Sequence, residues 1–387
     1  MNAAQTLVMK SLCFAKMQAV ADVAARAGKS IPNVTKTINE LTELGVVLEC
    51  GYAVSSGGRR PLQYRLNHQN LPNILSVSID QYYTSVAIYD LSFEIVTPVQ
   101  TIYNPVNNGN ECLRATKAII TEVINNHSGS PIMAIGLTMP GFVDSATGQN
   151  HSYTADHPLF NLCKTIQDLS GIQTLMENDS TAIAIAEKNF GQAYRSQDIL
   201  VVNLNWGVGL GMIIHDRLFK GHSGYAGEFS HIPLSDENTL CSCGKRGCLE
   251  VEASLSAAVS AAMQRLSQGE ISSLQQTYSS KGLIHGDQLM DAANEGDQLA
   301  IETINKIAYM LGKGIATLIH IINPEYVVIS GRGAKVGRIL LPQIQSALLQ
   351  YSIDRLSKHT TVLVSELTQA QLLGGACVAV EKAKWIV

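Results

Sequence analysis

The sequence predicts an α/β protein of two lobes, preceded by a small helical module that carries a β-hairpin. The chain has 387 residues, which exceeds one compact domain, since domains typically hold ~100–200 residues. From about residue 74 onward, short buried strands alternate with helices, a pattern typical of sheets covered by helices. The first seventy residues differ, because they combine helical apolar stripes with a turn rich in Gly and Arg.

Composition and charge divide the chain at the same place. The chain is 46% hydrophobic and 16% charged, so it can bury a large core and is not disordered. Its net charge of −4 argues against a protein that coats nucleic acid along its whole length. Residues 1–70 nevertheless hold eight Lys/Arg and four Asp/Glu, a balance of +4, whereas the remainder has a balance of −8. This asymmetry predicts one module for a polyanion and another for a different ligand.

Two features predict a cytoplasmic protein that neither enters nor crosses a membrane. No apolar region lies between Lys10 and Lys16, and no apolar stretch reaches the ~18–20 residues of a membrane span. Cytoplasmic thiols stay reduced, so the eight cysteines do not indicate a disulfide framework. Five scattered cysteines are expected to be buried, unreactive thiols: Cys13, Cys50, Cys112, Cys163 and Cys377.

Apolar residues at helical spacing predict three helices within the first 45 residues. Gly28 closes the second helix, and Ser30 can cap the third, with Pro32 in its first turn. Helix, short turn, then helix with a polar N-terminal face is typical of a helix-turn-helix. The apolar positions are Leu7, Leu12 and Phe14, then Val20, Val23 and Ala24, then Val34, Ile38, Leu41 and Leu44.

A β-hairpin, or wing, is expected after these helices. An extended run begins at Val46, residues 55–61 form a turn, and residues 62–66 alternate as a second strand. Arginines on such a loop suit the narrow minor groove of A·T-rich DNA. The alternative is a three-helix protein-interaction module with a solvated basic loop. The residues expected to contact DNA are Asn33, Thr35 and Lys36 in the major groove and Arg59 and Arg60 on the wing.

The remaining residues predict sheets whose binding sites lie beyond the carboxyl ends of their strands. Strands are expected at residues 74–79, 84–89, 132–137, 199–204 and 327–330, and helices at 113–125, 181–190 and 299–321.

One cluster of cysteines predicts a metal site. One imidazole and three thiolates make a tetrahedral Cys₃His set, and Gly244 and Gly247 allow the tight turn that the thiolates need to converge. Four protein ligands leave no open position, so the zinc would be structural; the alternative is a set of free thiols. The four ligands are His231, Cys241, Cys243 and Cys248.

Two segments, residues 221–231 and 241–250, resemble the paired signature of the ROK family (repressors, open reading frames, sugar kinases). Residues 139–144, 177–179 and 323–331 also match. The resemblance runs from about residue 75 onward, and the N-terminal module places it in the repressor branch, with the N-acetylglucosamine and xylose repressors.

The resemblance implies a fold and three domains. The fold is α/β: a winged helix-turn-helix followed by a two-lobed, actin-like, sugar-kinase-like (ribonuclease H-like) ATPase-type domain. Residues 1–70 would form the DNA-binding domain. Residues 74–195 would form lobe I, completed by a C-terminal helix at 370–387. Residues 196–369 would form lobe II, with the zinc site and an oligomerisation surface.

The resemblance also implies a sugar site between the lobes. In ROK kinases an Asn-Asp pair binds sugar hydroxyls, and its Asp is the general base, a role that would fall to Asp179. His231 would serve both zinc and sugar, which couples the metal to the ligand. The implied sugar-binding residues are Gly141, Asn178, Asp179, Glu228, His231 and Glu250.

The phosphate loops depart from the kinase pattern. The family's Asp-x-Gly-Gly-Thr loop aligns with residues 80–84, where Tyr82 and Tyr83 replace both glycines. The second loop, residues 205–209, carries Trp206 in place of a hydroxyl residue. Tyrosine resists positive φ and fills the space that a phosphate needs. We therefore expect neither ATP nor Mg²⁺ to bind, and no catalytic role for Asp179.

These observations favour a sugar-responsive transcriptional regulator, a repressor that releases operator DNA when a sugar or sugar phosphate binds. The alternative is an ATP-dependent hexose or N-acetylhexosamine kinase that keeps a DNA-binding head. A third hypothesis is a module whose signal comes from a protein partner such as a sugar-transport component. The family and operator symmetry imply a homodimer or homotetramer.

Overall fold

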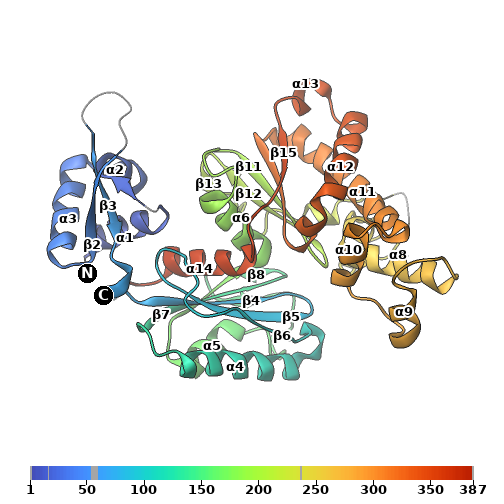
Figure 1. The fold of residues 1–387 in the computed structure, drawn as a ribbon, viewed down its shortest axis with the longest axis horizontal. Helices are drawn as coiled ribbons and strands as arrows, with labels where there is room; N and C mark the ends of the chain where they lie inside the picture. Colours follow the sequence, from blue (N-terminus) through green and yellow to red (C-terminus); the bar gives the residue numbers. More distant parts are fainter. Residues whose placement is uncertain (1, 16, 54–59, 236–237, 386–387) are drawn as a thin grey trace. The chain divides into compact units, whose positions relative to one another are not determined.

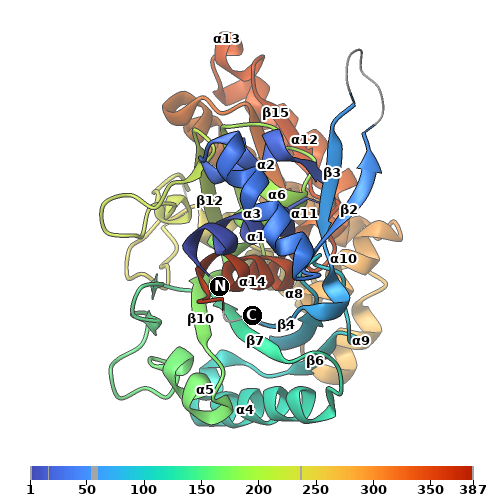
Figure 2. The same ribbon diagram turned by 90° about the vertical axis from the view of Figure 1, so that its left-hand side faces the viewer.

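The chain forms two compact units in a computed structural model that describes residues 2–15, 17–53, 60–235 and 238–385. Unit 1 comprises Met1–Ala182 with Leu372–Val387, and unit 2 comprises Ile183–Gln371. The division falls inside helix α6 (Asp179–Phe190), earlier than the boundary after residue 195 that the sequence predicts. The C-terminal helix belongs to unit 1 (Figures 1 and 2).

Unit 1 begins with three helices and a three-stranded sheet of order β1-β3-β2, in which β3 is antiparallel to both neighbours. Gly28 ends the second helix in the left-handed conformation with φ 60°, as its position predicts. Ser30 precedes the third helix but makes no side-chain capping bond, contrary to expectation; Pro32 lies at the first turn instead. The elements are α1 (Ala3–Cys13), β1 (Gln18–Ala19), α2 (Val20–Ala27), α3 (Ile31–Glu43), β2 (Val47–Tyr52), β3 (Leu62–Leu66) and η1 (His68–Asn70).

The body of unit 1 is a five-stranded sheet of order β10-β7-β4-β5-β6. Strands β4, β5 and β6 form an antiparallel meander, while β7 and β10 run parallel to β4. Helices α4 and α5 cover one face and α14 lies over the other (Figure 1). The elements are β4 (Asn73–Ile79), β5 (Tyr83–Tyr89), β6 (Gln100–Tyr103), η2 (Val106–Asn108), α4 (Gly109–Asn126), β7 (Ile132–Met139), β8 (Val143–Asp144), β9 (Gln149–Asn150), α5 (Leu162–Ser170), β10 (Thr174–Asn178) and α14 (Ala370–Lys382).

Unit 2 repeats this topology with the order β13-β12-β11-β14-β15. Its first three strands again form an antiparallel meander, and β14 and β15 again run parallel to the first. The elements are β11 (Ile199–Leu204), β12 (Val208–Ile214), β13 (Arg217–Leu218), η3 (Phe229–His231), α7 (Glu250–Ala253), α8 (Leu255–Ser267), α9 (Gln275–Lys281), α10 (Gly286–Asn294), α11 (Gln298–Ile322), β14 (Tyr326–Ser330), η4 (Arg332–Val336), α12 (Gly337–Tyr351), α13 (Asp354–Ser357) and β15 (Thr361–Val364).

The central strands lie where the sequence predicts them. Every residue of β4 and β11 is buried, as expected of strands covered by helices on both faces. Four of the five scattered cysteines are buried, but Cys50 is only half-buried, because it lies on β2 at the edge of its sheet. Among the described residues, no helix combines the length and apolar character that a membrane crossing requires.

Candidate functional site

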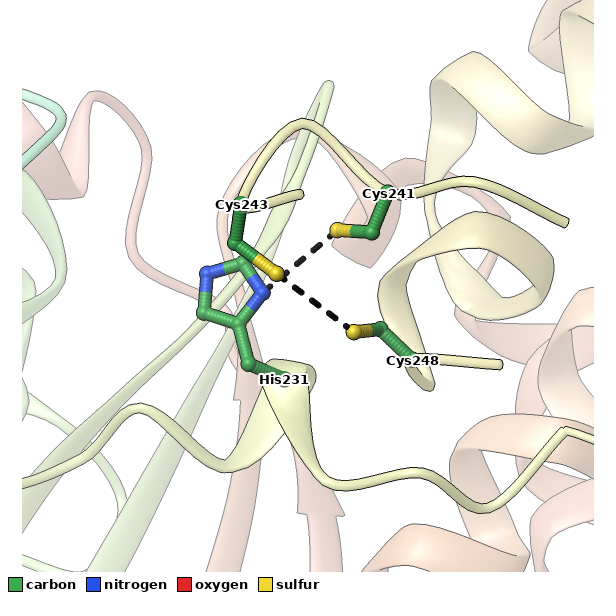
Figure 3. Close-up of side chains that lie close together, drawn as sticks. All are labelled: His231, Cys241, Cys243 and Cys248. Atoms are coloured by element: carbon green, nitrogen blue, oxygen red, sulfur yellow. Dashed lines mark hydrogen bonds between the residues drawn. The ribbon is translucent and has the colours of Figure 1, made fainter. Parts of the chain in front are cut away.

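The four predicted metal ligands converge in unit 2 (Figure 3). Their ligand atoms all lie within 4.8 Å of one another. Cys241 Sγ lies 3.6 Å from His231 Nδ1, and Cys243 Sγ lies 3.6 Å from Cys248 Sγ. A tetrahedral zinc with Zn–S bonds of about 2.3 Å needs sulfur atoms roughly 3.8 Å apart. The donor set and its spacing therefore fit a closed, four-coordinate zinc site.

Local backbone geometry brings these ligands together. Gly244 and Gly247 adopt φ values of 81° and 74°, the left-handed conformation expected of them. The Gly244 amide donates to the Cys241 carbonyl at 2.9 Å, which closes the turn between the first thiols. The Leu249 amide donates to the Ile232 carbonyl at 3.0 Å, so the segment after His231 runs beside Cys248.

The thiols of the cluster differ in acidity. A hydrogen bond from the Lys245 backbone amide is the main cause that lowers the pKa of Cys243. Burial raises the pKa of Cys248 to about 12. A bound cation would stabilise both as thiolates, so metal binding would release protons from the site.

His231 faces two ways within unit 2. Its Nδ1 is directed at the cysteine cluster, and its Nε2 lies 3.6 Å from Glu228 Oε2. A carboxylate beside the second nitrogen of a metal-ligating histidine fixes the orientation of the ring. Two predicted sugar-binding residues, Glu228 and His231, thus lie directly beside the candidate zinc site.

Glu250 lies elsewhere in unit 2, against the loop between β11 and β12. Its Oε2 accepts a hydrogen bond from the Val208 amide at 3.4 Å. A Cβ atom on Gly207 would lie 2.7 Å from the same oxygen, so a side chain there would displace the carboxylate. Glu250 therefore holds the loop at Gly207 and Val208 in place.

The other predicted sugar-binding residues meet in unit 1. Asn178 Nδ2 donates to the Gly141 carbonyl at 3.1 Å, and Asn178 Oδ1 accepts from the Thr181 amide at 3.0 Å. Asp179, the first residue of α6, is buried and accepts from the Ser180 amide at 2.8 Å. Asn178 thereby joins the end of β10 to the turn after β7.

Two residues that hold this turn were not predicted from the sequence. Ser152 Oγ accepts from the Phe142 amide at 2.9 Å, and Asn150 Nδ2 donates to the Pro140 carbonyl at 2.9 Å. A Cβ on Gly141, whose φ is 105°, would lie 2.3 Å from Ser152 Oγ. The turn therefore requires glycine, and no local pattern in residues 150–152 signals their role.

The first phosphate-loop position is closed on itself. The amides of Tyr82 and Tyr83 both donate to Asp80 Oδ1 at 2.7 Å. The Tyr83 ring packs edge-on against Tyr103, with centroids 5.7 Å apart. The two backbone amides of this loop are thus directed at the Asp80 carboxylate, and the Tyr83 ring contacts Tyr103.

The second loop is filled by an indole. Trp206 is buried, and its ring lies so close to Gly286 that a Cβ there would come within 2.4 Å of it. The Arg332 guanidinium lies 5.5 Å from the Trp206 ring centroid and also reaches Asp287. Trp206 is therefore a packed core residue of unit 2, a role that the sequence alone did not predict.

Three of the predicted DNA-contacting residues lie on α3. Asn33 and Lys36 are exposed, whereas Thr35 is half-buried and donates to the Ile31 carbonyl at 2.9 Å. Arg60 is exposed, and Arg59 lies outside the described residues. A groove on this helix is lined by Ile31, Pro32, Thr35, Lys36, Asn39, Glu40 and Glu43.

The exposure of Ile31 is an addition to the predicted set. It is the first residue of α3, and 53% of its surface is exposed. An exposed aliphatic side chain at the start of such a helix can contact the thymine methyl group in a major groove. The sequence does not distinguish Ile31 from the core positions of the helix, because its side chain is equally apolar.

The repeated five-stranded topology and the Cys₃His cluster define a two-unit mixed α/β protein of the kind shared by sugar kinases and related regulators. The model of the ROK family matches residues 74–383. The chain belongs to the ROK family.

Relatives extend this match. The xylose repressor of Caldicellulosiruptor bescii is 26% identical over 379 residues, 96% of this chain and 94% of that protein. The DNA-binding transcriptional dual regulator NagC of Escherichia coli is 28% identical over 349 residues, 88% of this chain and 83% of that protein. The crystal structure of a ROK family transcriptional regulator, a homologue of the E. coli MLC protein, has a TM-score of 0.76 at 24% identity. It covers 98% of this chain and 96% of that one.

A kinase relative covers less of the chain. The glucokinase of Halalkalibacterium halodurans is 30% identical over 254 residues, which is 65% of this chain and 77% of that protein. Similarity to the repressors therefore extends over a larger part of the chain than similarity to this kinase.

Proposed function

We propose that this chain is a sugar-responsive, DNA-binding transcriptional regulator of the cytoplasm, a repressor that releases its operator when sugar binds. One observation carries the proposal. A module of three helices and a hairpin precedes a ROK body that keeps the residues for sugar, while tyrosines replace both glycines of the first phosphate loop and the buried Trp206 stands in the second. Such a body can bind a sugar without phosphorylating it.

DNA binding would fall to residues 1–70, acting as a winged helix-turn-helix. The proposed contacts are Asn33, Thr35 and Lys36 on α3 and Arg59 and Arg60 on the wing. Because Thr35 is half-buried, we propose that it lies at the edge of the DNA-contacting surface. We add the exposed Ile31 to the proposed DNA contacts. Two copies in a homodimer or homotetramer would read the two halves of a palindromic operator.

The residues proposed to bind sugar are Gly141, Asn178 and Asp179 in unit 1, and Glu228, His231 and Glu250 in unit 2. Amide and carboxylate groups at these positions can pair with several hydroxyls and reject molecules that lack them. The relatives' names include a xylose repressor, an N-acetylglucosamine repressor and a glucokinase, so the ligand class we propose is a pentose, a hexose or an N-acetylhexosamine, free or phosphorylated.

Zinc would bind to His231, Cys241, Cys243 and Cys248 as a structural ion. It would hold the loop of residues 241–248 against the segment that carries Glu228, and its ligation would orient the His231 ring towards Glu228. In this way the metal would pre-form the unit 2 half of the sugar site.

The sugar response would be a population shift. A sugar that binds one arrangement of the regulator better than the DNA-binding arrangement lowers operator affinity by the ratio of its two affinities. A sugar-transport protein could supply a further signal; capture of such a partner only in the absence of sugar would distinguish that route from direct sensing.

Thermal unfolding of the zinc-loaded protein tests ligand class directly. We expect one member of a panel of glucose, xylose, N-acetylglucosamine and their phosphates to stabilise the protein by about 2.7 kcal/mol at 100 times its Kd. Mg-ATP should produce no shift, with or without sugar, and no ADP should form. A shift with Mg-ATP that strengthens with sugar would establish the kinase alternative instead.

Variants of α3 test the DNA-binding face. Lys36→Ala is expected to weaken binding to all duplexes alike and to reduce the salt dependence of log K by about one unit, because one phosphate contact is lost. Asn33→Ala should instead relax sequence preference at one base pair and cost about 1–3 kcal/mol. Lys281→Ala, on exposed α9, is the control. If Lys36→Ala and this control have the same DNA affinity and the same salt dependence, α3 is excluded as the DNA interface.

A further inference from the structure

A buried ion pair ties the end of strand β10 to the end of helix α14 within unit 1. Glu177 directly precedes the Asn178-Asp179 pair, and its side chain is 1% exposed. Lys382 Nζ donates to Glu177 Oε2 at 2.8 Å, while Glu177 Oε1 accepts from the Asn178 amide at 3.1 Å. The buried Glu177 carboxylate is balanced by this half-buried lysine, so the pair links the end of β10 to the last residue of α14.

The same end of α14 holds the N-terminal module. Lys10, in the last turn of α1, donates from Nζ to the Glu381 carbonyl at 2.5 Å and to the Ala383 carbonyl at 3.4 Å. The last carbonyls of a helix carry partial negative charge and lack helical partners, so a lysine is well placed there. The contact is partly desolvated, because burial lowers the pKa of Lys10.

A carboxyl group lies among these lysines. Glu381 is exposed at the surface; partial desolvation raises its pKa, while Lys382, Lys10 and Arg26 act in the opposite direction. Arg26 also lies 5.7 Å from the Phe14 ring centroid, and Phe14 packs against Phe93 of the sheet body at 5.2 Å. The N-terminal module therefore contacts the body at the end of α14 and at an aromatic pair.

Helix α14 is seated directly on the sheet. A Cβ on Gly136 of β7 would lie 1.9 Å from the Gly375 carbonyl oxygen, so backbone meets backbone. Ser76 Oγ of β4 donates to the Leu372 carbonyl at 2.6 Å. These contacts and the full burial of residues 376–380 hold the helix against the sheet, and the end of the helix carries both lysine contacts.

We propose that the last turn of α14 couples the sugar-binding residues to the DNA-binding module, through Glu177–Lys382 on one side and Lys10 on the other. This inference rests on the proposed function. A change at Asn178 moves the Glu177 carboxylate, the Lys382 ammonium follows it, and the carbonyls that hold Lys10 shift with the turn. Lys10 and Lys382 are thus positioning residues that contact neither sugar nor DNA.

The experiment separates coupling from binding. Operator Kd is measured by fluorescence anisotropy on a duplex selected by the wild type from a randomised pool, with and without the panel sugar that releases it best. Sugar Kd is measured by calorimetry without DNA. The variants are Lys10→Met, Lys382→Met and the double variant, with Lys10→Arg as the conservative replacement. Lys164→Met, exposed on α5, is the control.

Wild type and Lys164→Met should show a ratio of operator Kd values with and without sugar of roughly 5–150, the usual range of allosteric coupling. Lys10→Met and Lys382→Met should bring this ratio below about threefold while each separate Kd changes less than fivefold. The double variant should be no worse than either single variant, and Lys10→Arg should restore the ratio.

Full coupling in both folded Met variants would overturn the inference and leave the proposed function intact. Failure of every sugar to release the wild type would instead contradict the proposed function. In that case the coupling is measured by amide hydrogen exchange with and without operator DNA. Operator binding should slow exchange of the Thr174–Asn178 amides in the wild type but not in Lys10→Met. Equal protection in both proteins would overturn the inference, and Lys10→Arg serves the same test if Lys10→Met does not fold.

Discussion

Removal of zinc is expected to destabilise unit 2 by several kcal/mol and to abolish the response to sugar. The ion would hold four ligands from two segments, and without it the buried Cys248 thiol stays protonated, with its pKa near 12. At ~2–4 °C per kcal/mol for a unit of this size, the unfolding midpoint should fall by about 10 °C. Cys248→Ser should reproduce the effect of a chelator.

Metal analysis and calorimetry check this expectation. The wild type should carry one zinc ion per chain and Cys248→Ser none, while Cys50→Ser, which lies on β2 outside the cluster, should keep both zinc and midpoint. Zinc affinity should fall as pH falls, because binding displaces protons from the thiols. A Cys248→Ser protein with full zinc content and an unchanged midpoint would rule out the site.

Replacement of Glu250 is expected to lock the regulator on its operator. A hydrogen bond to a charged group contributes about 1.5–3 kcal/mol, so Glu250→Ala should weaken sugar binding roughly 10–100-fold. Operator affinity without sugar should stay unchanged, since Glu250 lies in unit 2 and the proposed DNA-binding face lies on α3 in unit 1.

Sugar titration of the operator complex measures this effect. The matched control is Glu295→Ala, which removes an exposed carboxylate at the end of α10. The sugar affinity of Glu250→Gln should lie between those of the wild type and Glu250→Ala, because the glutamine side chain can still accept a hydrogen bond from the Val208 amide. Release of Glu250→Ala at the sugar concentration that releases the wild type would place the inducer site elsewhere.

Local pattern predicted a large part of the fold. The runs that form β4 and β11 are mainly apolar, although β4 contains two serines and β11 an asparagine, and such runs are typical of strands buried on both faces. The cysteine cluster could also be predicted from the sequence, because three of its ligands lie within eight residues with two glycines between them. Both glycines adopt the left-handed conformation that the turn requires.

Contacts between distant residues had no such signal. Glu250 was assigned to sugar by family resemblance, yet its hydrogen bond to the Val208 amide depends on how two loops meet. Lys10 and Lys382 are ordinary lysines in the sequence, and only the packing of α14 brings both to its last turn. The sequence shows Trp206 only as the residue that replaces a hydroxyl in the second phosphate loop. Its packing against Gly286 and Arg332 could not be predicted, because it brings together three segments that are distant in the sequence.

The proposed function requires that sugar binding alone changes the affinity of this ROK chain for its operator, without phosphorylation of the sugar. The most direct test is operator release by the sugar panel, with ADP formation assayed in the same samples. One sugar should raise the operator Kd by at least fivefold in the absence of ATP, and no ADP should form when ATP is added. Turnover of ATP with a sugar, together with an operator affinity that no sugar changes, would contradict it.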